Sequence, residues 1–183
     1  EKNAPLLPTL VAPGTVRKAW WRCPKGHSYR AAISSRAGGG TGCPFCAGQK
    51  VIQGENDFAS QYPQLAAQWD RQKNGALIPE AVTSGSNRRV WWRCEKGHSY
   101  PAVIAHRVRS GSDCPYCSNH KILPGFNDLA TIDPVVASQW HPTRNGSLTP
   151  QQVTPGSRRK VWWLCDKGHA WRSVISSRTG KNG

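Results

Sequence analysis

Three copies of one aromatic and Cys/His motif, spaced by 71 residues, constrain this chain more than any other feature. The copies read AWWRCPKGHSY from Ala19, VWWRCEKGHSY from Val90 and VWWLCDKGHAW from Val161. Prolines, glycines and arginines outside the motif recur at the same offset without an insertion. Self-similarity at a fixed period indicates a tandem array, so we expect three small modules where a length of 183 residues alone would suggest one or two domains.

The offset also predicts where the modules begin and end, at residues 1–52, 53–123 and 124–183. The first module lacks the helical segment that precedes the motif in the other two. The third lacks a final cysteine pair, which the offset would place near positions 185 and 188, beyond Gly183. We therefore expect the chain to be a piece of a longer protein.

A helical segment is predicted before the second motif. Asn56 or Asp57 can cap a short turn of helix, and Pro63 stands where a second helix would begin. Leu65 and Trp69 are four residues apart, so we expect them on one face of that helix. Asn74, followed by glycine, should end it, because both residue types tolerate the left-handed conformation. The third copy repeats this pattern.

A β-hairpin is predicted around each Cys-x-x-x-His turn. In the second copy, residues 90–94 are rich in aromatic and branched side chains, and residues 99–107 alternate in character, as two paired strands would. Gly97 in the turn can adopt backbone angles that a Cβ would resist, so we expect turn N–H groups to point at the thiolate. The predicted fold class is therefore a tandem of small α+β modules, each with a hairpin and short helices.

The cysteines and histidines are spaced as metal ligands. Two short loops, separated by 15 residues, supply two ligands each, which is typical of the closed tetrahedral Cys3His arrangement of structural zinc. The recurrence in register argues against the alternative of a redox dithiol. Such a site would stabilise a small core by on the order of 10 kcal/mol, and it leaves no open position for catalysis. The predicted ligands are Cys23, His27, Cys43 and Cys46; Cys94, His98, Cys114 and Cys117; and the half site Cys165 and His169.

The motif WW-x-C-x3-GH followed by CPxC, with a P-x6-W segment before it, resembles a bacterial tandem family described as a probable zinc-ribbon domain, whose members are also grouped with treble-clef zinc fingers. The resemblance covers nearly the whole chain. It implies zinc binding, tandem copies, and frequent occurrence in larger proteins that also contain endonuclease-like or DNA-handling domains. The third copy departs from the pattern because its CxxC pair is missing.

The charge indicates a polyanionic partner. The chain has 25 basic and 10 acidic residues, a formal net charge of +15, although general solubility is an alternative reading. The cations recur in register, with Arg158 added in the third copy, and we expect them to contact nucleic acid. They are the basic residues before each tryptophan pair, Arg17, Lys18, Arg88, Arg89, Arg158, Arg159 and Lys160; the turn lysines, Lys25, Lys96 and Lys167; and the arginines expected at the hairpin ends, Arg36, Arg107 and Arg178.

The tryptophan pairs have two possible uses. Strand alternation places Trp91 and Trp92 on opposite faces, so we expect one to cover the hairpin core and the other to be more exposed. An exposed tryptophan could stack on a base, whereas packing against the segment that carries Trp69 or Trp140 is the favoured interpretation.

These observations favour a non-catalytic, zinc-stabilised module that binds DNA, chiefly duplex DNA through its phosphates, within a larger DNA-handling protein. An accessory region of a nuclease, or a zinc module for RNA or protein interaction, are the alternatives. Glu55, Asp57 and Asp128 are better explained as helix-start residues than as a Mg²⁺ site. No apolar run approaches the roughly 20 residues that span a bilayer, and the cysteine usage favours a reducing cytoplasm.

Overall fold

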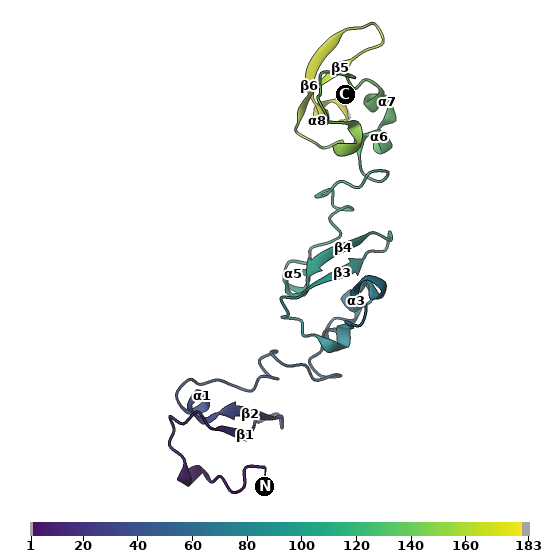
Figure 1. Ribbon diagram of the computed structural model, residues 1–183. Helices are drawn as coiled ribbons and strands as arrows, with labels where there is room; N and C mark the ends of the chain where they lie inside the picture. The colour runs from purple at the N-terminus through teal and green to yellow at the C-terminus, as the bar shows by residue number, and fades with distance from the viewer. Residues whose placement is uncertain (1, 181–183) are drawn as a thin grey trace. The chain divides into compact units, whose positions relative to one another are not determined.

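The computed structural model describes residues 2–180, and the chain divides into two compact units, Glu1–Gly111 and Ser112–Gly183. Each sheet is a two-stranded antiparallel hairpin (Figure 1). The first unit contains β1 (Lys18–Arg22), β2 (Ser28–Ala32), α1 (Ile33–Ala37), α2 (Phe58–Gln61), α3 (Pro63–Ala66), α4 (Arg71–Asn74), β3 (Arg89–Arg93), β4 (Ser99–Val103) and α5 (Ile104–Ser110), with 3-10 turns at Pro8–Leu10 and Pro79–Ala81. The second contains α6 (Leu129–Ile132), α7 (Pro134–Ser138), β5 (Lys160–Leu164), β6 (Ala170–Val174) and α8 (Ile175–Arg178), with a 3-10 turn at Pro150–Gln152.

The three hairpins have the same register, which confirms the predicted pairing around the Cys-x-x-x-His turn. Trp21 lies opposite Tyr29, Trp92 opposite Tyr100, and Trp163 opposite Trp171. The second tryptophan of each pair therefore faces an aromatic partner across the hairpin. Such cross-strand aromatic pairs stabilise an isolated hairpin that has no further strands on which to rely.

The second strand of each hairpin is shorter than predicted. In the second hairpin, β4 ends at Val103 and residues 104–110 form α5, so the predicted strand over 99–107 is wrong in its last part. Arg89, at the start of β3, pairs with Val103, and beyond this pair the N–H groups of Ile104 and Ala105 donate to the carbonyls of Arg88 and Ser86 as the helix begins. The chain turns into a helix that buries Ile104 completely.

Trp69 does not lie on the predicted helix. The helix α3 ends at Ala66, and Trp69 instead forms an isolated antiparallel bridge with Trp92 on the outer edge of β3. The N–H of Arg93 donates to the carbonyl of Gln68 (2.6 Å), so this short segment provides hydrogen-bond partners for backbone groups on the edge of β3. The third copy repeats the arrangement, with Trp140 bridged to Trp163.

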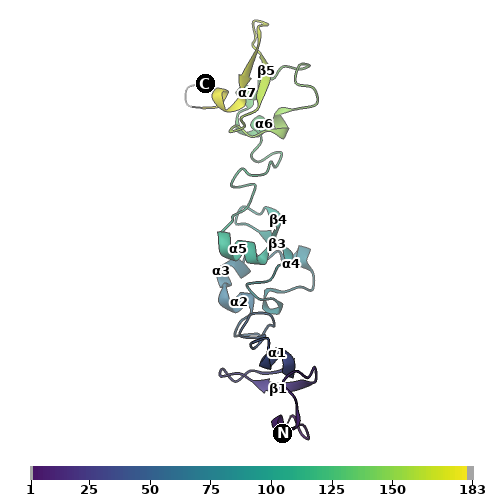
Figure 2. The same ribbon diagram turned by 90° about the vertical axis from the view of Figure 1, so that its left-hand side faces the viewer.

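The helix starts follow the sequence prediction. Asp57 caps α2, Asp128 caps α6 and Asp133 caps α7, each by accepting a hydrogen bond from a backbone N–H three residues on. Pro63 opens α3, as expected. In Figure 2 these short helices lie beside the hairpin that follows them in the chain.

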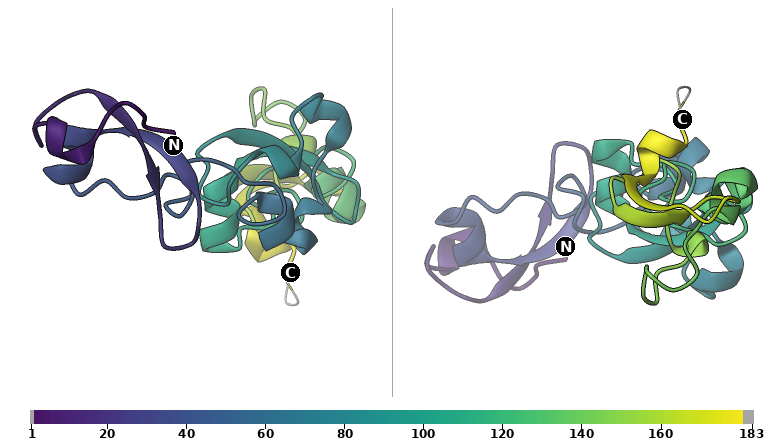
Figure 3. Two further views of the ribbon diagram at one scale, coloured as in Figure 1. Left: turned by 90° about the horizontal axis from the view of Figure 1, so that it is seen from below. Right: turned by 90° about the horizontal axis from the view of Figure 1, so that it is seen from above.

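Each of the two later copies has a core built on its second tryptophan. Trp92 is fully buried and contacts Phe58 and Trp69, with ring centroids 5.7 and 5.5 Å away. In the second unit, Trp163 is fully buried in a cluster with Leu129 and other buried aliphatic residues, and Figure 3 shows its hairpin with α8 at the end of β6. Among residues 2–180, no helix has the length and apolar character needed to cross a membrane.

Candidate metal centres and basic surfaces

The first predicted ligand set converges. The thiol sulfurs of Cys23, Cys43 and Cys46 and a ring nitrogen of His27 all lie within 4.8 Å of one another. Two ligands come from the β1–β2 turn and two from the loop that follows α1. The separations are 3.8 Å between the sulfurs of Cys23 and Cys46, and 3.5, 3.7 and 3.3 Å from His27 Nδ1 to the sulfurs of Cys23, Cys43 and Cys46.

These separations fit a zinc ion. Zn–S bonds of about 2.3 Å and Zn–N bonds of about 2.0–2.1 Å at tetrahedral angles would place two sulfurs about 3.8 Å apart and a sulfur and a nitrogen about 3.6 Å apart. The observed distances lie close to both values. The donor set of three thiols and an imidazole is itself typical of structural zinc, where four protein ligands leave no site for water or substrate.

The turn between Cys23 and His27 is fixed by backbone hydrogen bonds. The N–H of Cys23 donates to the carbonyl of His27 (3.1 Å), and the N–H of Gly26 donates to the carbonyl of Cys23 (2.9 Å). Gly26 has a φ of +87°, which confirms the predicted need for glycine. The N–H of Gly26 itself does not point at the thiolate, because it donates to the carbonyl of Cys23.

Glu55 contacts the far side of the His27 ring. Its Oε2 lies 3.0 Å from His27 Nε2, while Nδ1 faces the three sulfurs. This hydrogen bond is the first cause of the raised pKa of His27, and it is followed by the hydrogen bond with Cys43. A carboxylate in this position holds the ring with Nδ1 as the ligand atom, as the outer partners of metal-bound histidines do. Glu55, which the sequence placed at a helix start, is therefore a partner of a metal ligand.

The thiols of the first set affect one another. Burial works to raise the pKa of Cys43, but backbone N–H groups of Cys46 and Phe45 outweigh it and lower that pKa to about 7. Burial, together with neighbouring Cys23 and Cys43, raises the pKa of Cys46 to about 11. Three thiolates so close together repel one another, and a shared divalent cation is what allows all of them to ionise.

The second ligand set also converges, and the third remains a pair. One ligand atom each from Cys94, His98, Cys114 and Cys117 lies within the same 4.8 Å limit. His98 Nδ1 is 3.5 Å from the sulfur of Cys94, which matches the first set. Cys165 and His169 form the same contact at 3.6 Å, as the predicted half site requires.

The second cysteine loop of each set is tied to the start of the next helical segment. Asn56 accepts a hydrogen bond from the N–H of Ile52 and donates to the carbonyls of Phe45 and Lys50 (2.9 Å each). Asn127 makes the corresponding bonds in the next copy. One asparagine side chain therefore connects each CPxC loop to the aspartate-capped helix that follows it.

A comparison with known protein families agrees with these metal sites. The family model described as a probable treble clef zinc finger domain matches residues 1–49, 65–120 and 136–183. The matches cover most of the chain, and the chain belongs to this family. Together with the two converged ligand sets, the family shows that the protein is a tandem array of zinc-binding modules. No curated protein matches the chain.

Most of the predicted nucleic-acid contacts lie on the surface. Ten of the thirteen cations are exposed: Arg17, Lys18, Lys25, Arg88, Arg89, Lys96, Arg158, Arg159, Lys160 and Lys167. In each copy one group of cations lies at the start of the first hairpin strand, and the turn lysine lies just beyond the end of the same strand. A partner in solution can therefore approach both ends of that strand.

Arg36, Arg107 and Arg178 are placed differently. They lie on the helices after the hairpins and point inward, so their predicted role in contacting nucleic acid is not supported. The Arg107 guanidinium lies 5.2 Å from the centroid of Trp92, and the residue is only 3 % exposed. Its counterparts, Arg36 and Arg178, stack on the second tryptophan of their own hairpins at 5.2 and 5.4 Å. These arginines fasten the helix to the core.

The tryptophan pairs divide as predicted. The second member is buried: Trp92 and Trp163 are fully covered, and the T-shaped contacts with Trp69 and Trp140 confirm the favoured packing interpretation. The first member is more accessible, and Trp20 is 40 % exposed. The sequence reasoning missed that a cation lies over the ring of each first tryptophan. The available signal was that positions 2, 73 and 144, related by the 71-residue offset, are all basic.

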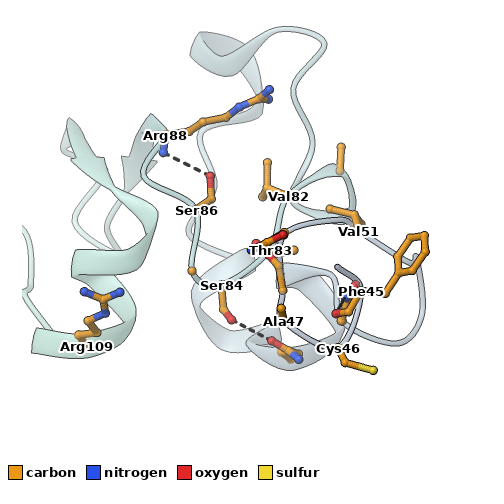
Figure 4. A pocket seen from close by; sticks show the side chains of 16 residues that line it. Phe45, Cys46, Ala47, Val51, Val82, Thr83, Ser84, Ser86, Arg88 and Arg109 are labelled. Atoms are coloured by element: carbon orange, nitrogen blue, oxygen red, sulfur yellow. Dashed lines mark hydrogen bonds between the residues drawn. The ribbon is translucent and has the colours of Figure 1, made fainter. Parts of the chain in front are cut away.

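A large cavity lies near the first ligand set, and it is basic. It has a volume of about 850 Å³ and lies between the loop containing Cys46 and the loop from Val82 to Arg88. Figure 4 shows Arg88 and Arg109 on one side of it and Ala47, Cys46 and Phe45 on the other, with Ser84 nearer the centre. Among the described residues that line it there is no aspartate or glutamate, so this recess offers cations and hydroxyls and no carboxylate ligand for Mg²⁺.

Proposed function

We propose that the protein is a non-catalytic nucleic-acid-binding array, with duplex DNA as its partner and zinc as the element that holds each basic surface in place. The observation that carries the proposal is the recurrence of exposed cations at both ends of the first hairpin strand, next to each ligand turn. Three modules with the same charged positions can contact a regular row of phosphates.

The charge of the whole chain supports the same partner. A formal net charge of +15 produces a field that attracts polyanions, and the cations that recur in register are attached to short, rigid hairpins. Lysines and arginines on such elements bind phosphates and fix the position of a protein on DNA without reading sequence. The proposed binding is therefore mainly to the backbone.

Zinc supports this function indirectly. Four protein ligands complete each of the two full sites, so the metal stabilises the fold and does not act on a substrate. The 850 Å³ recess likewise combines arginines with hydroxyl groups and suits phosphate better than a metal-dependent reaction. Thiolate ligands persist in reducing surroundings, and we place the function in the cytoplasm, close to the DNA.

The test is a binding titration at several salt concentrations, with duplex DNA, single-stranded DNA and RNA as competitors and zinc quantified in the same sample. If each module neutralises about three phosphates, log K should fall with log salt at a slope of about −8. A slope shallower than about −3, or a preference for RNA or a protein partner over duplex DNA, would overturn the proposal. Cleavage of DNA by the chain in the presence of divalent cations would assign it to an enzyme.

A matched pair of variants makes the test specific. Arg88→Ala with Arg89→Ala removes two exposed cations, and the slope should become less steep by about 2. Arg71→Ala is the control, because Arg71 is exposed but lies 3.9 Å from the carboxylate of Glu80. Equal effects per charge in the two variants would mean that net charge alone drives binding.

A further inference from the structure

The first tryptophan of every hairpin carries a cation on its ring. Lys2 Nζ lies 5.0 Å from the centroid of Trp20, and Lys73 Nζ lies 4.2 Å from the centroid of Trp91. In the third hairpin the Arg144 guanidinium lies 4.8 Å from the centroid of Trp162. These distances are within the range of about 6 Å in which a cation is attracted by an indole ring. The contact recurs at the 71-residue offset, with the residue type varying between lysine and arginine while the positive charge is kept.

An asparagine next to each cation fixes this arrangement. Asn74 Oδ1 accepts from the N–H of Trp91 (2.8 Å), and Asn74 Nδ2 donates to the carbonyl of the same residue (2.7 Å). Asn3 forms the same two bonds with Trp20, and Asn145 forms them with Trp162. Because the asparagine directly follows the cation in the chain, these two bonds hold the backbone of the cation close to the strand that carries the indole.

The cation–indole pair lies on the basic face of the hairpin. Strand alternation places Arg89 and Arg93 on the same side of β3 as Trp91, and Lys18 and Arg22 on the same side of β1 as Trp20. The acidic group beside β3 is Asp70, which is 3 % exposed and whose carboxylate lies 3.6 Å from Arg93 Nε. Asp70 therefore offsets the charge of Arg93, whereas Lys73 and Arg89 are exposed.

We infer that each hairpin face contains a phosphodiester-binding site in which the cation on the first tryptophan, Lys2, Lys73 or Arg144, is a direct phosphate ligand and the indole is a positioning residue. The inference rests on the proposed function and adds residues to it. A cation held against a ring loses less conformational freedom when it binds than a free lysine does. The indole face that a base would need for stacking is occupied by the cation, so the site recognises backbone phosphate and not a base.

Removal of the three cations tests the phosphate contact. The full chain carrying Lys2→Ala, Lys73→Ala and Arg144→Ala should bind a DNA duplex about 100-fold more weakly, with a salt slope less steep by about 3. The charge-matched control removes three exposed cations that lie elsewhere, through Lys50→Ala, Arg71→Ala and Lys121→Ala. If both triple variants lose the same affinity and slope while the unaltered chain binds DNA, the inference is wrong and the proposed function stands. If the unaltered chain binds no nucleic acid, both fail.

Exchange of the three indoles tests the positioning role. With Trp20→Leu, Trp91→Leu and Trp162→Leu the charge is unchanged, so we expect weaker binding with most of the salt slope kept. Phenylalanine at the same positions keeps a ring for the cation and should restore most of the affinity, whereas a purely apolar packing role would be served equally well by leucine. The zinc content of each variant reports whether its two complete sites are folded, and the indole N–H resonance of Trp163 reports on the third hairpin.

Base stacking is the outcome that would reverse the assignment. If the first tryptophan binds bases, removal of Lys2 and Lys73 uncovers the rings of Trp20 and Trp91, whereas after removal of Arg144 the Arg172 guanidinium, 5.8 Å from the centroid of Trp162, still lies over the third ring. Binding of oligo-dT would then strengthen and quench tryptophan fluorescence more than in the unaltered chain. Under the phosphate assignment, binding of oligo-dT weakens in parallel with duplex binding.

Discussion

The hairpins β1–β2 and β3–β4 share a motif and a register but differ in how they bury the second tryptophan. Trp92 is fully covered, with Phe58 and Trp69 against it. Trp21 is only half-buried, and it borders an apolar cavity of about 500 Å³ whose lining includes Leu6 and Leu7. The same local sequence therefore gives the same hairpin and ligand turn, while the completeness of the core depends on the segment that precedes the hairpin.

This difference separates two sources of stability. The ligand turn and the hairpin are local features, and the zinc ion fastens them to the CPxC loop. The aromatic core is contributed from outside the motif, through the bridge of Trp69 with Trp92 and its counterpart, Trp140 with Trp163. A module with a poorer core should rely more on its metal. The part of the third module that the structure describes has a full core and two ligands, so this part should rely on metal least.

Metal removal should produce the largest effect and should distinguish the three hairpins. A structural zinc site contributes on the order of 10 kcal/mol, more than the half-covered core around Trp21 can replace. As a chelator is titrated, we expect the indole N–H resonance of Trp21, which donates to the carbonyl of Ala31 at 3.1 Å, to disappear first. The resonance of Trp163, which donates to Ser173, should persist longest. Simultaneous loss of all three resonances, or no loss, would contradict the division between metal and core.

Truncation of the second tryptophan should rank next. With zinc saturating, Trp92→Ala should cost about 3–5 kcal/mol, because it empties a fully packed position, while Trp21→Ala should cost clearly less. Hydrogen exchange of the β3 and β1 amides measures the two losses separately within one chain. Equal losses of stability would show that the exposed fraction of the Trp21 ring does not predict how much the ring contributes to the free energy of unfolding.

The sequence was sufficient for the parts of the fold that depend on local patterns. The repeat predicted the hairpins, the ligand sets and the aspartate caps, since each follows from residue type and spacing within a short segment. Trp69 shows where this reasoning stops. Its spacing from Leu65 matched a helix, but the backbone of β3 offered an unpaired edge, and the chain left the helix to form that pairing.

The charged residues show a second limit. Arg107 and Arg89 look equivalent in sequence, as cations near the ends of the hairpin strands. Only the turn of the chain after Val103 decides that Arg107 faces Trp92 while Arg89 faces solvent. Glu55 was misassigned for a similar reason, because its contact with His27 joins residues 28 positions apart that no local pattern connects.

Glu55 also distinguishes the two complete metal sites. At the first site its carboxylate holds the His27 ring, whereas the 71-residue offset places Phe126 at the corresponding position, and a phenyl ring accepts no conventional hydrogen bond. Glu55→Gln keeps the size of the side chain and removes its charge. We expect it to weaken zinc binding at the first site by about 10-fold and to leave the second site unchanged.

Competition with a chromophoric chelator, followed by the indole resonances of Trp21 and Trp92, assigns the loss in the Glu55→Gln variant to a site. Glu80→Gln is the control, because Glu80 contacts Arg71 and no metal ligand. An equal weakening at both sites would mean that Glu55 acts through the net charge of the chain.

The buried helix caps should give the smallest effect, with a defined dependence on pH. Asp128 is fully buried, and although burial works to raise its pKa, hydrogen bonds from Thr131 and Gly125 hold that pKa below its ordinary value. Because the folded-state pKa is depressed, the carboxylate stabilises the fold above the ordinary value of about 3.9, and this contribution is lost as the pH falls through the folded-state pKa. Asp128→Asn should therefore cost about 1 kcal/mol at pH 7 and progressively less below about pH 4.

Asp57, which caps α2 in the same way, allows the cap to be compared in two settings. Its pKa is also lowered, by Ser60 and Gly54 against the opposing effect of burial. Acid protonates the zinc ligands as well. Asn56 and Asn127 tie the helices that Asp57 and Asp128 cap to the CPxC loops of the first and second metal sites, so each variant reports on its cap and the neighbouring metal together. Amide hydrogen exchange of α2 and α6 between pH 7 and pH 4 measures the loss of stability in the Asp57→Asn and Asp128→Asn variants. A difference between the unaltered chain and the Asp128→Asn variant that grows as the pH falls would show that the cap is not ionised in the folded chain.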